Sequence, residues 1–175
     1  MRIWVFLALP MLSACMGGMQ ALVLSGAPDI GGAAGGITVV PEPVTGDLGH
    51  VSFSLLLNDE RAAGGIREVA ANPLLSRAAQ SHAVDMVENS YFSHTDLEGG
   101  RASDRVEAVG YDWDFIAENL AQGFGTERSV IDAWMASPGH RDNIMDARAE
   151  EFGLGREDST WVLLLGRQAG APASP

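Results

Sequence analysis

The segment of residues 160–167, TWVLLLGR, constrains the fold more than any other part of the sequence. It is apolar almost throughout and has the length of a single strand. A strand of this kind is buried on both faces, which requires helices on both sides of its sheet. The sequence therefore predicts a three-layer sandwich of helix, sheet and helix, in the α+β class, without fixing the strand order.

Capping and turn residues divide the rest of the chain into elements. Asn72 and Pro73 suit the N-cap and the first position of a helix. Ser103 suits the N-cap of a short helix that Gly110 stops, and Ser137 can end one helix and cap the next. The expected helices cover residues 51–63, 73–89, 104–109 and 126–136, and the further strands cover residues 113–121 and 152–156.

Residues 1–15, MRIWVFLALPMLSAC, predict export. One positive charge precedes an apolar run that is too short to span a bilayer, which is typical of a signal peptide. The ending LSAC resembles the lipobox of bacterial lipoproteins, in which the signal is cut before a cysteine that becomes lipidated. We therefore expect a signal peptide at 1–14 and a membrane-anchored cell-envelope lipoprotein lipidated at Cys15. An ordinary signal peptide that contains a cysteine is the alternative.

The segment of residues 15–49 is rich in Gly and Pro and nearly uncharged, so it reads as a flexible tether. The folded domain is expected at 50–168, followed by a disordered tail at 169–175. A formal net charge of −12 with no basic cluster excludes a nucleic-acid partner. The single cysteine excludes an intramolecular disulfide, so the domain depends on its hydrophobic core. The sequence gives no oligomeric state.

Seven blocks in one order resemble a known family. The blocks are LLNDERAAGG, NPLLSRAAQSHAVDM, YFSHTD, DRVEAVGY, AENLAQG, AWMASPGHRDNI and FGLG. They resemble the CAP superfamily, also called the SCP or pathogenesis-related 1 type, and most closely its bacterial secreted branch. This resemblance implies an α-β-α sandwich of the CAP/SCP type with a small central sheet and a large cleft.

The resemblance also implies a polar cluster in that cleft. The block FSH supplies His94, AEN supplies Glu118 and GHR supplies His140. The fourth family position departs, because Ser137 stands where many eukaryotic members have a glutamate three residues after the helical tryptophan, here Trp134.

Two imidazoles and a carboxylate are compatible with an incomplete Zn²⁺ site, with His94 and His140 as ligands. They are equally compatible with a hydrogen-bonded cluster that requires no cofactor. His82 lies on the apolar stripe of its helix, which predicts a core histidine bonded to the backbone.

Three functions remain open at this point. The first and favoured one is a cell-envelope binding module that holds a lipid or other apolar ligand beside the cluster. The second is a metal-dependent, peptidase-like hydrolase with Glu118 as its general base. The third is a non-catalytic interaction protein of the envelope. Polar residues of the matched blocks, among them Arg61, Asn119 and Asn143, are expected to bond to the local backbone.

Overall fold

The computed structural model describes residues 48–170, with side chains from residue 51 onward. The predicted signal peptide at 1–14, the lipidation site Cys15, most of the predicted tether at 15–49 and the end of the predicted tail lie outside these residues. The first helix begins at Leu48, two residues before the predicted start of the domain.

A four-stranded sheet with the order β1-β3-β4-β2 forms the middle layer. β1 runs parallel to β3, and the other neighbours are antiparallel. The seven residues from Thr160 to Gly166 in β4 are all buried, which confirms the predicted burial on both faces. The strands are β1 (Ala70–Ala71), β2 (Trp113–Gln122), β3 (Glu151–Glu157) and β4 (Thr160–Gln168).

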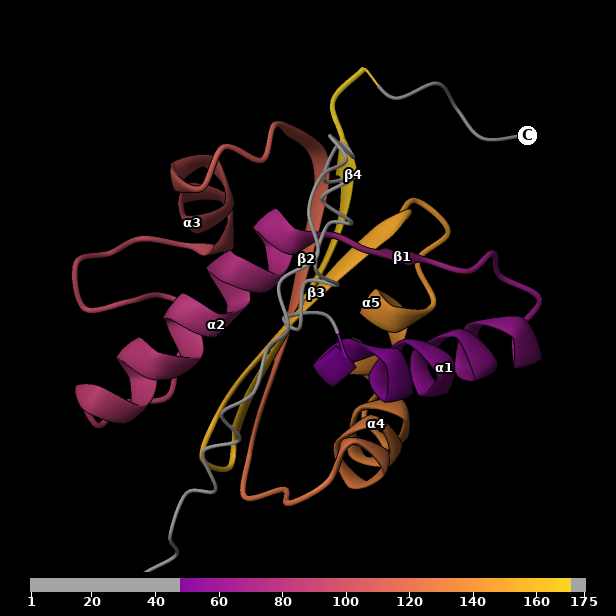
Figure 1. Cartoon of the computed structure of the whole chain (residues 1–175), viewed down its shortest axis with the longest axis horizontal. Coiled ribbons are helices and arrows are strands. Elements are labelled where there is room, and N and C mark those ends of the chain that lie inside the picture. The colour runs from indigo at the N-terminus through magenta and orange to yellow at the C-terminus, as the bar shows by residue number, and fades with distance from the viewer. Residues whose placement is uncertain (1–47, 171–175) are drawn as a thin grey trace, which may run out of the picture. The chain divides into compact units, whose positions relative to one another are not determined.

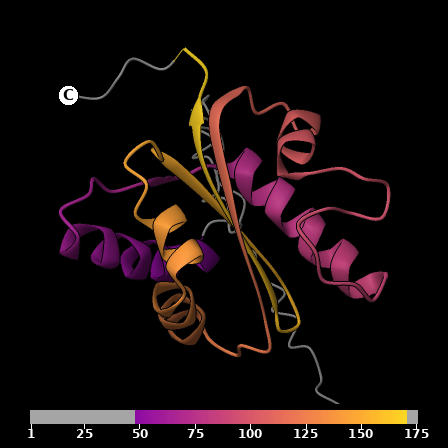
Figure 2. The ribbon, with the colours of Figure 1, turned by 180° about the vertical axis from the view of Figure 1, so that it is seen from behind.

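Helices cover both faces of this sheet, as a strand buried on both faces requires. Two of them, α2 and α3, lie on one side, and α1, α4 and α5 lie on the other (Figures 1 and 2). The helices are α1 (Leu48–Ala63), α2 (Pro73–Glu88), α3 (Ala102–Ala108), α4 (Glu127–Ala136) and α5 (Pro138–Ile144). The predicted helix, sheet and helix layers are therefore present.

Local capping residues set most of the helix boundaries. The side chain of Asn72 accepts hydrogen bonds from the backbone N–H groups of Leu74 and Leu75 at the start of α2, as predicted. The predicted start of α3 is wrong, since Arg101 and not Ser103 is its N-cap. Asp104 accepts a hydrogen bond of 2.7 Å from the backbone N–H of Arg101, and this bond starts the helix two residues earlier than predicted.

The edge strand β1 was not predicted. It is only two residues long and exposed. A strand of two residues carries no alternation of apolar and polar side chains, so no sequence pattern marks it. Its pairing depends on β3, which comes about 80 residues later in the chain by the register of Ala70 with Glu151.

Two glycines in β3 allow α2 to pack directly on the sheet. A Cβ atom on Gly153 would lie 2.1 Å from the backbone carbonyl carbon of Leu75, and one on Gly155 would lie 2.2 Å from that of Ala79. Both distances are far below van der Waals contact. The glycines of the FGLG block are therefore required by this close helix–sheet packing.

Each face of the sheet has its own hydrophobic core. The core toward α1, α4 and α5 includes Phe53, Trp134 and Phe152, with Phe53 in an edge-to-face contact with Trp134. The core toward α2 and α3 includes Met86 and Val106. Because both cores are closed around the sheet, the strand that carries the site is held rigidly from both sides.

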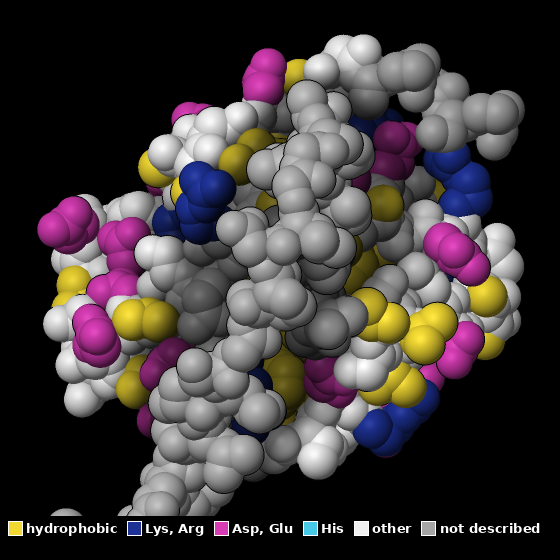
Figure 3. Space-filling view, viewed as in Figure 1, with side chains coloured by type: hydrophobic (Ala, Val, Ile, Leu, Met, Phe, Trp, Pro, Cys, Tyr) yellow, Lys and Arg dark blue, Asp and Glu magenta, His cyan; other side chains and the backbone are white. Residues whose placement is uncertain are grey.

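The surface shows where charged and apolar side chains gather. In Figure 3 the visible arginines occur in separate places among acidic side chains, without a basic stripe. Hydrophobic side chains gather over α1, where Val51 and Leu55 are exposed. Among residues 48–170, no helix combines the length and the apolar character that crossing a bilayer would require.

Candidate functional site

The loop between α2 and α3, residues 89–101, forms a pocket with the neighbouring strand β2. The pocket has a volume of about 420 Å³ and is lined by His94, Thr95, Arg101, Ala102 and Glu118. Four of these five residues carry polar or charged side chains. Two of the predicted cleft residues, His94 and Glu118, thus lie in one pocket.

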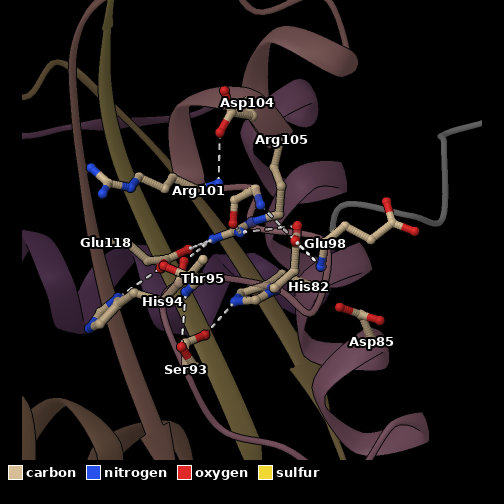
Figure 4. A network of polar contacts seen from close by, with 12 residues as sticks. His82, Asp85, Ser93, His94, Thr95, Glu98, Arg101, Asp104, Arg105 and Glu118 are labelled. Atoms are coloured by element: carbon tan, nitrogen blue, oxygen red, sulfur yellow. Dashed lines mark hydrogen bonds and ion pairs between the residues drawn. The ribbon is translucent and has the colours of Figure 1, made fainter.

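Glu118 is the buried centre of the site. It lies on β2, and only 5% of its side chain is exposed. Its Oε1 is 2.8 Å from Nδ1 of His94, and its Oε2 accepts a hydrogen bond of 2.7 Å from Nη2 of Arg105 (Figure 4). Because a carboxylate accepts, Nδ1 of His94 carries the proton in this pair. Both oxygens of Glu118 are therefore engaged within the protein.

Arg105 on α3 ties the loop to the strand, and sequence reasoning missed it. Its guanidinium donates to the backbone oxygens of His94 and Gly100 as well as to Glu118. It also lies 3.9 Å from a carboxylate oxygen of Asp96. A charged group that contacts the middle and the end of a loop as well as a buried carboxylate holds that part of the loop in one conformation. The only signal in the sequence was a basic residue in the middle of a short predicted helix.

Arg101, four residues earlier, was also missed and has a different role. Its guanidinium lines the pocket, and no hydrogen bond or ion pair reaches it from any residue in the described range. In Figure 4 its side chain extends over the strand on the same side as His94. In a chain with a net charge of −12, a cation without a carboxylate partner marks a place that can receive an anion.

His140 and Ser137 form a second pair, outside this pocket. His140 stands in the first turn of α5, and its Nδ1 is 3.0 Å from Oγ of Ser137. Burial lowers the pKa of His140, and the nearby imidazole of His94 lowers it further. Within the predicted cluster, His94 pairs with Glu118 and His140 pairs with Ser137, and the two imidazoles are near enough to interact electrostatically.

An amide network on β2 connects the two pairs. Asn119 is fully buried and donates a hydrogen bond of 3.0 Å to the backbone oxygen of His140. Asn143 donates to the backbone oxygen of Glu118 and to the side chain of Asn119. These asparagines bond to a distant element and not, as was predicted, to the local backbone, and in this way they fix α5 against β2.

His82 on α2 contacts the backbone of the 89–101 loop. It is 1% exposed, and its Nε2 is 2.9 Å from the backbone oxygen of Ser93, which confirms the predicted core histidine. Among residues 48–170, its buried Nδ1 has no hydrogen-bond partner, and neither has Nε of Arg105. Burial lowers the pKa of His82, and the charge of Arg105 lowers it further. The base of the loop thus holds a neutral imidazole beside a guanidinium.

The residues present do not fit a zinc ion. A zinc site needs about three protein ligands with free electron pairs. Between residues 48 and 170, no three His, Cys, Asp or Glu side chains are grouped so that they could hold a metal. Glu118 already contacts the positive charge of Arg105, which would repel a cation. We therefore derive no chemistry through a metal.

Sequence comparison finds a matching family and bacterial relatives. The model of the cysteine-rich secretory protein family, CAP, matches residues 55–162. The YkwD protein of Bacillus subtilis is 33% identical over 104 residues, which cover 59% of this chain and 40% of YkwD. A protein of Borreliella burgdorferi is 27% identical over 99 residues, or 54% of this chain and 63% of that protein. The matched region therefore spans less than half of YkwD.

Solved structures show the same fold. The SCP domain of an extracellular protein from Bacillus anthracis matches 67% of this chain and 39% of that protein, with a TM-score of 0.65 and 25% identity. An outer surface protein of Borrelia burgdorferi matches 67% of this chain and 90% of its own, with a TM-score of 0.63 and 21% identity. These likenesses confirm the predicted α+β fold.

Proposed function

The chain belongs to the cysteine-rich secretory protein family, CAP, and from that premise we propose that it is an exported, non-catalytic binding module of the cell envelope. Export is supported by the names of its relatives, which include an extracellular protein and an outer surface protein. The ligand in this proposal carries an anionic group, a carboxylate or a phosphate, that binds in the pocket beside Arg101.

The free guanidinium of Arg101 is the observation that carries this proposal. Glu118, the only acidic lining residue of the pocket, already pairs with Arg105 and His94. The pocket is therefore left with an unpaired positive charge at Arg101. A guanidinium binds carboxylates and phosphates through parallel N–H···O bonds, so an anionic ligand is favoured there.

The sequence predicted a lipid or other apolar ligand. The polar side chains that line the pocket favour a ligand that also carries a polar group. An entirely apolar ligand would leave the side chains of Arg101 and Thr95 without partners. On the same loop, however, Phe92 and Leu97 are 47% and 69% exposed. These side chains can contact the apolar part of a ligand, so the proposal is an amphipathic ligand with an anionic group.

The geometry gives the hydrolase alternative little support. A general base needs a free acceptor within reach of substrate, and both oxygens of Glu118 already accept hydrogen bonds or ion pairs. The Ser137–His140 contact joins residues three apart at a helix start. Across the part of the chain that the structure describes, no carboxylate contacts His140 to orient it as a catalytic base.

Titration with small anions tests the proposal. We would add acetate and inorganic phosphate separately to the ¹⁵N-labelled protein and follow the backbone amides by NMR. The proposal predicts saturable shifts at Thr95, Arg101 and Ala102, with dissociation constants in the millimolar range because each probe makes few contacts. Methylammonium, a cation of similar size to acetate, should produce no such shifts.

Variants identify the group that binds. Arg101→Gln should abolish the shifts with both anions. Arg77→Gln is the matched control, because Arg77 is a surface arginine on α2 that does not line the pocket. Equal binding by the Arg101 variant and the parent protein would overturn the proposal.

Attachment to a membrane through Cys15 is the second part of the proposal. It is supported by the LSAC sequence after an apolar run, in residues that the structure does not describe. Two or more acyl chains give stable attachment, whereas one chain is marginal. Cys15→Ser should move the protein from the membrane fraction to the soluble fraction. If the variant stayed with the membrane, the lipoprotein prediction would be lost.

A further inference from the structure

We propose that the outer edge of β2, beside the pocket, binds an extended acidic peptide as an added strand. The inference rests on the proposed function, since the peptide's carboxylate is the anionic group that Arg101 receives. It goes further by naming the ligand class and a second set of contacts, the open backbone groups of the edge strand.

β2 is the last strand of the sheet, so only one of its edges is paired. The register joins Gln122 to Thr160, and the next residue, Gly123, donates its N–H to the oxygen of Ser159 at 2.9 Å. In an antiparallel pair, hydrogen-bonded and non-bonded residues alternate along the strand. The odd-numbered residues from 115 to 123 therefore bond to β4, and Ile116, Glu118 and Leu120 direct their N–H and C=O groups outward.

Side chains from the helical layer cover only one half of this edge. Trp134 donates its indole N–H to the oxygen of Leu120 at 3.1 Å. Asn143 donates to the oxygen of Glu118 at 3.3 Å. Both bonds confirm that the even-numbered carbonyls point outward. At Ile116, by contrast, the N–H and the C=O both lack a partner among residues 48–170, and so does the N–H of Glu118.

The open half of the edge coincides with the pocket. Glu118 belongs to both, because its backbone lies on the edge and its side chain lines the pocket. A strand added opposite Ile116 and Glu118 would place every second side chain on the pocket face, with Cβ atoms about 5 Å from those of β2. One of these side chains would lie beside Arg101 and His94, which extend over the strand in Figure 4.

The charge of the pocket selects an acidic side chain. Arg101 has no ion-pair partner in the described range, whereas the charge of Glu118 is balanced by its ion pair with Arg105. An acidic residue of the peptide would therefore gain an ion pair, whereas a basic residue would meet the guanidinium as a like charge. The side chain of Ile116 is partly exposed and would contact an apolar residue of the same peptide.

A peptide fits this surface better than a lipid does. Strand addition supplies one donor and one acceptor for every second residue, which the N–H and C=O of Ile116 both require. A lipid headgroup could bind Arg101 but carries no backbone pattern of this kind. The observations therefore favour the peptide, and binding of a lipid instead becomes an outcome of the test.

The experiment uses a capped peptide, acetyl-Thr-Val-Thr-Glu-Thr-Val-Thr-amide, with the full chain. At saturation the amide hydrogens of Ile116 and Glu118 should exchange with solvent at least about tenfold more slowly, because they become hydrogen-bonded. A peptide with Lys in place of Glu should bind at least about tenfold more weakly. A peptide methylated on alternate backbone nitrogens should not bind, since it lacks the N–H donors that would pair with β2.

Two protein variants separate the edge from the pocket. Ile116→Pro removes the outward N–H without breaking the ladder to β4, because proline is tolerated where a strand's N–H faces solvent. It should abolish peptide binding but retain acetate binding. Arg101→Gln should weaken both, and Arg77→Gln should weaken neither. If Ile116→Pro fails to fold, the methylated peptide tests the same hydrogen bonds in the unchanged protein.

The outcomes distinguish this inference from the proposed function. Binding of acetate without slowed exchange at Ile116 and Glu118 would overturn the proposed peptide binding and leave the proposed anion binding at Arg101. Absence of acetate binding and of slowed exchange would overturn both proposals. Vesicles of phosphatidylglycerol that displace the peptide's shifts at Arg101 without protecting Ile116 would replace the peptide with a lipid. Protection that rises with protein concentration and needs no peptide would assign the edge to a second copy of the chain.

Discussion

Two arginines, the fully buried Arg61 in the layer of α1 and the largely buried Arg105 in the layer of α3, join segments of the chain in different ways. Arg61 is fully buried, and its guanidinium donates only to neutral backbone oxygens. These oxygens belong to Arg67, Ile144, Asp146 and Ala149. The side chain of Arg105 is 12% exposed and donates to a carboxylate as well as to two carbonyls, yet its Nε has no partner within residues 48–170.

This difference separates the layer of α1, where the buried arginine is nearly satisfied, from the layer of α3, which contains the proposed binding pocket. Around Arg61, backbone oxygens of residues 67 and 144–149 meet a guanidinium whose donors are nearly all satisfied. Around Arg105, one buried nitrogen on Arg105 and one on His82 have no partner in the described part of the chain, and the pocket lies on the same loop. Native proteins satisfy most buried polar groups, so exceptions of this kind point to functional regions.

Replacement of the structural arginine should have the largest effect on stability. Arg61→Met keeps the aliphatic volume but leaves several buried carbonyls without a donor, so we expect a loss of at least about 3 kcal/mol in the free energy of unfolding. Urea unfolding of the variant and the parent protein measures this loss. Arg67→Gln is the control, because Arg67 forms only a long surface contact of 3.9 Å with Glu150. A loss below about 1 kcal/mol would mean that these carbonyls find other partners.

Replacement of the site arginine should cost less but act locally. Arg105→Gln removes charged hydrogen bonds to Glu118 and to the backbone oxygens of His94 and Gly100 in the 89–101 loop, for an expected loss of about 1.5 to 3 kcal/mol. Hydrogen exchange at Asp96 and Gly100 should accelerate in this variant and remain unchanged in Arg61→Met. Exchange that accelerates equally in both variants would remove the distinction between the two layers.

The smallest expected effect is a pH dependence at the base of the loop. The pKa values of His82 and His140 are lowered from 6.5 by burial. A lowered histidine pKa means that the unfolded chain takes up protons first as the pH falls below 6.5, so stability is complete above that value and declines below it.

The melting temperature should therefore fall between about pH 7 and about pH 5, and His82→Gln should reduce this fall. The carboxylates of Asp96 and Asp146 have lowered pKa values as well, but their contribution is lost only at much lower pH. An unchanged pH profile in the His82 variant would contradict the assignment of the histidine as a buried neutral group.

The sequence predicts the parts of this fold that depend on local patterns. The apolar run at 160–167 predicted the central strand, and Asn72 with Pro73 predicted the start of α2. The histidine on the apolar stripe, His82, was predicted to bond to the backbone and does so. In each case the determining interaction lies within the element or follows from burial alone.

The site was predicted only in part, because its contacts join distant elements. Resemblance to the family pointed to His94 and Glu118, which the structure places 2.8 Å apart. The same resemblance grouped His140 and Ser137 with them. These two residues lie 3.0 Å apart as a second pair, and His94 is near enough to His140 to lower its pKa. Arg105 was missed because its role depends on the path of the 89–101 loop, and no local pattern in the sequence specifies that path.

The coupling between Arg105 and Glu118 tests the central claim most directly, namely that Glu118 is a structural partner in a binding pocket. Unfolding free energies of Arg105→Gln, Glu118→Gln and the double variant give the interaction energy. We predict a coupling of about 1.5 kcal/mol or more, because this is a buried, charged hydrogen bond. Additive effects, within about 0.5 kcal/mol, would show that Glu118 is not held by Arg105 and would contradict the account.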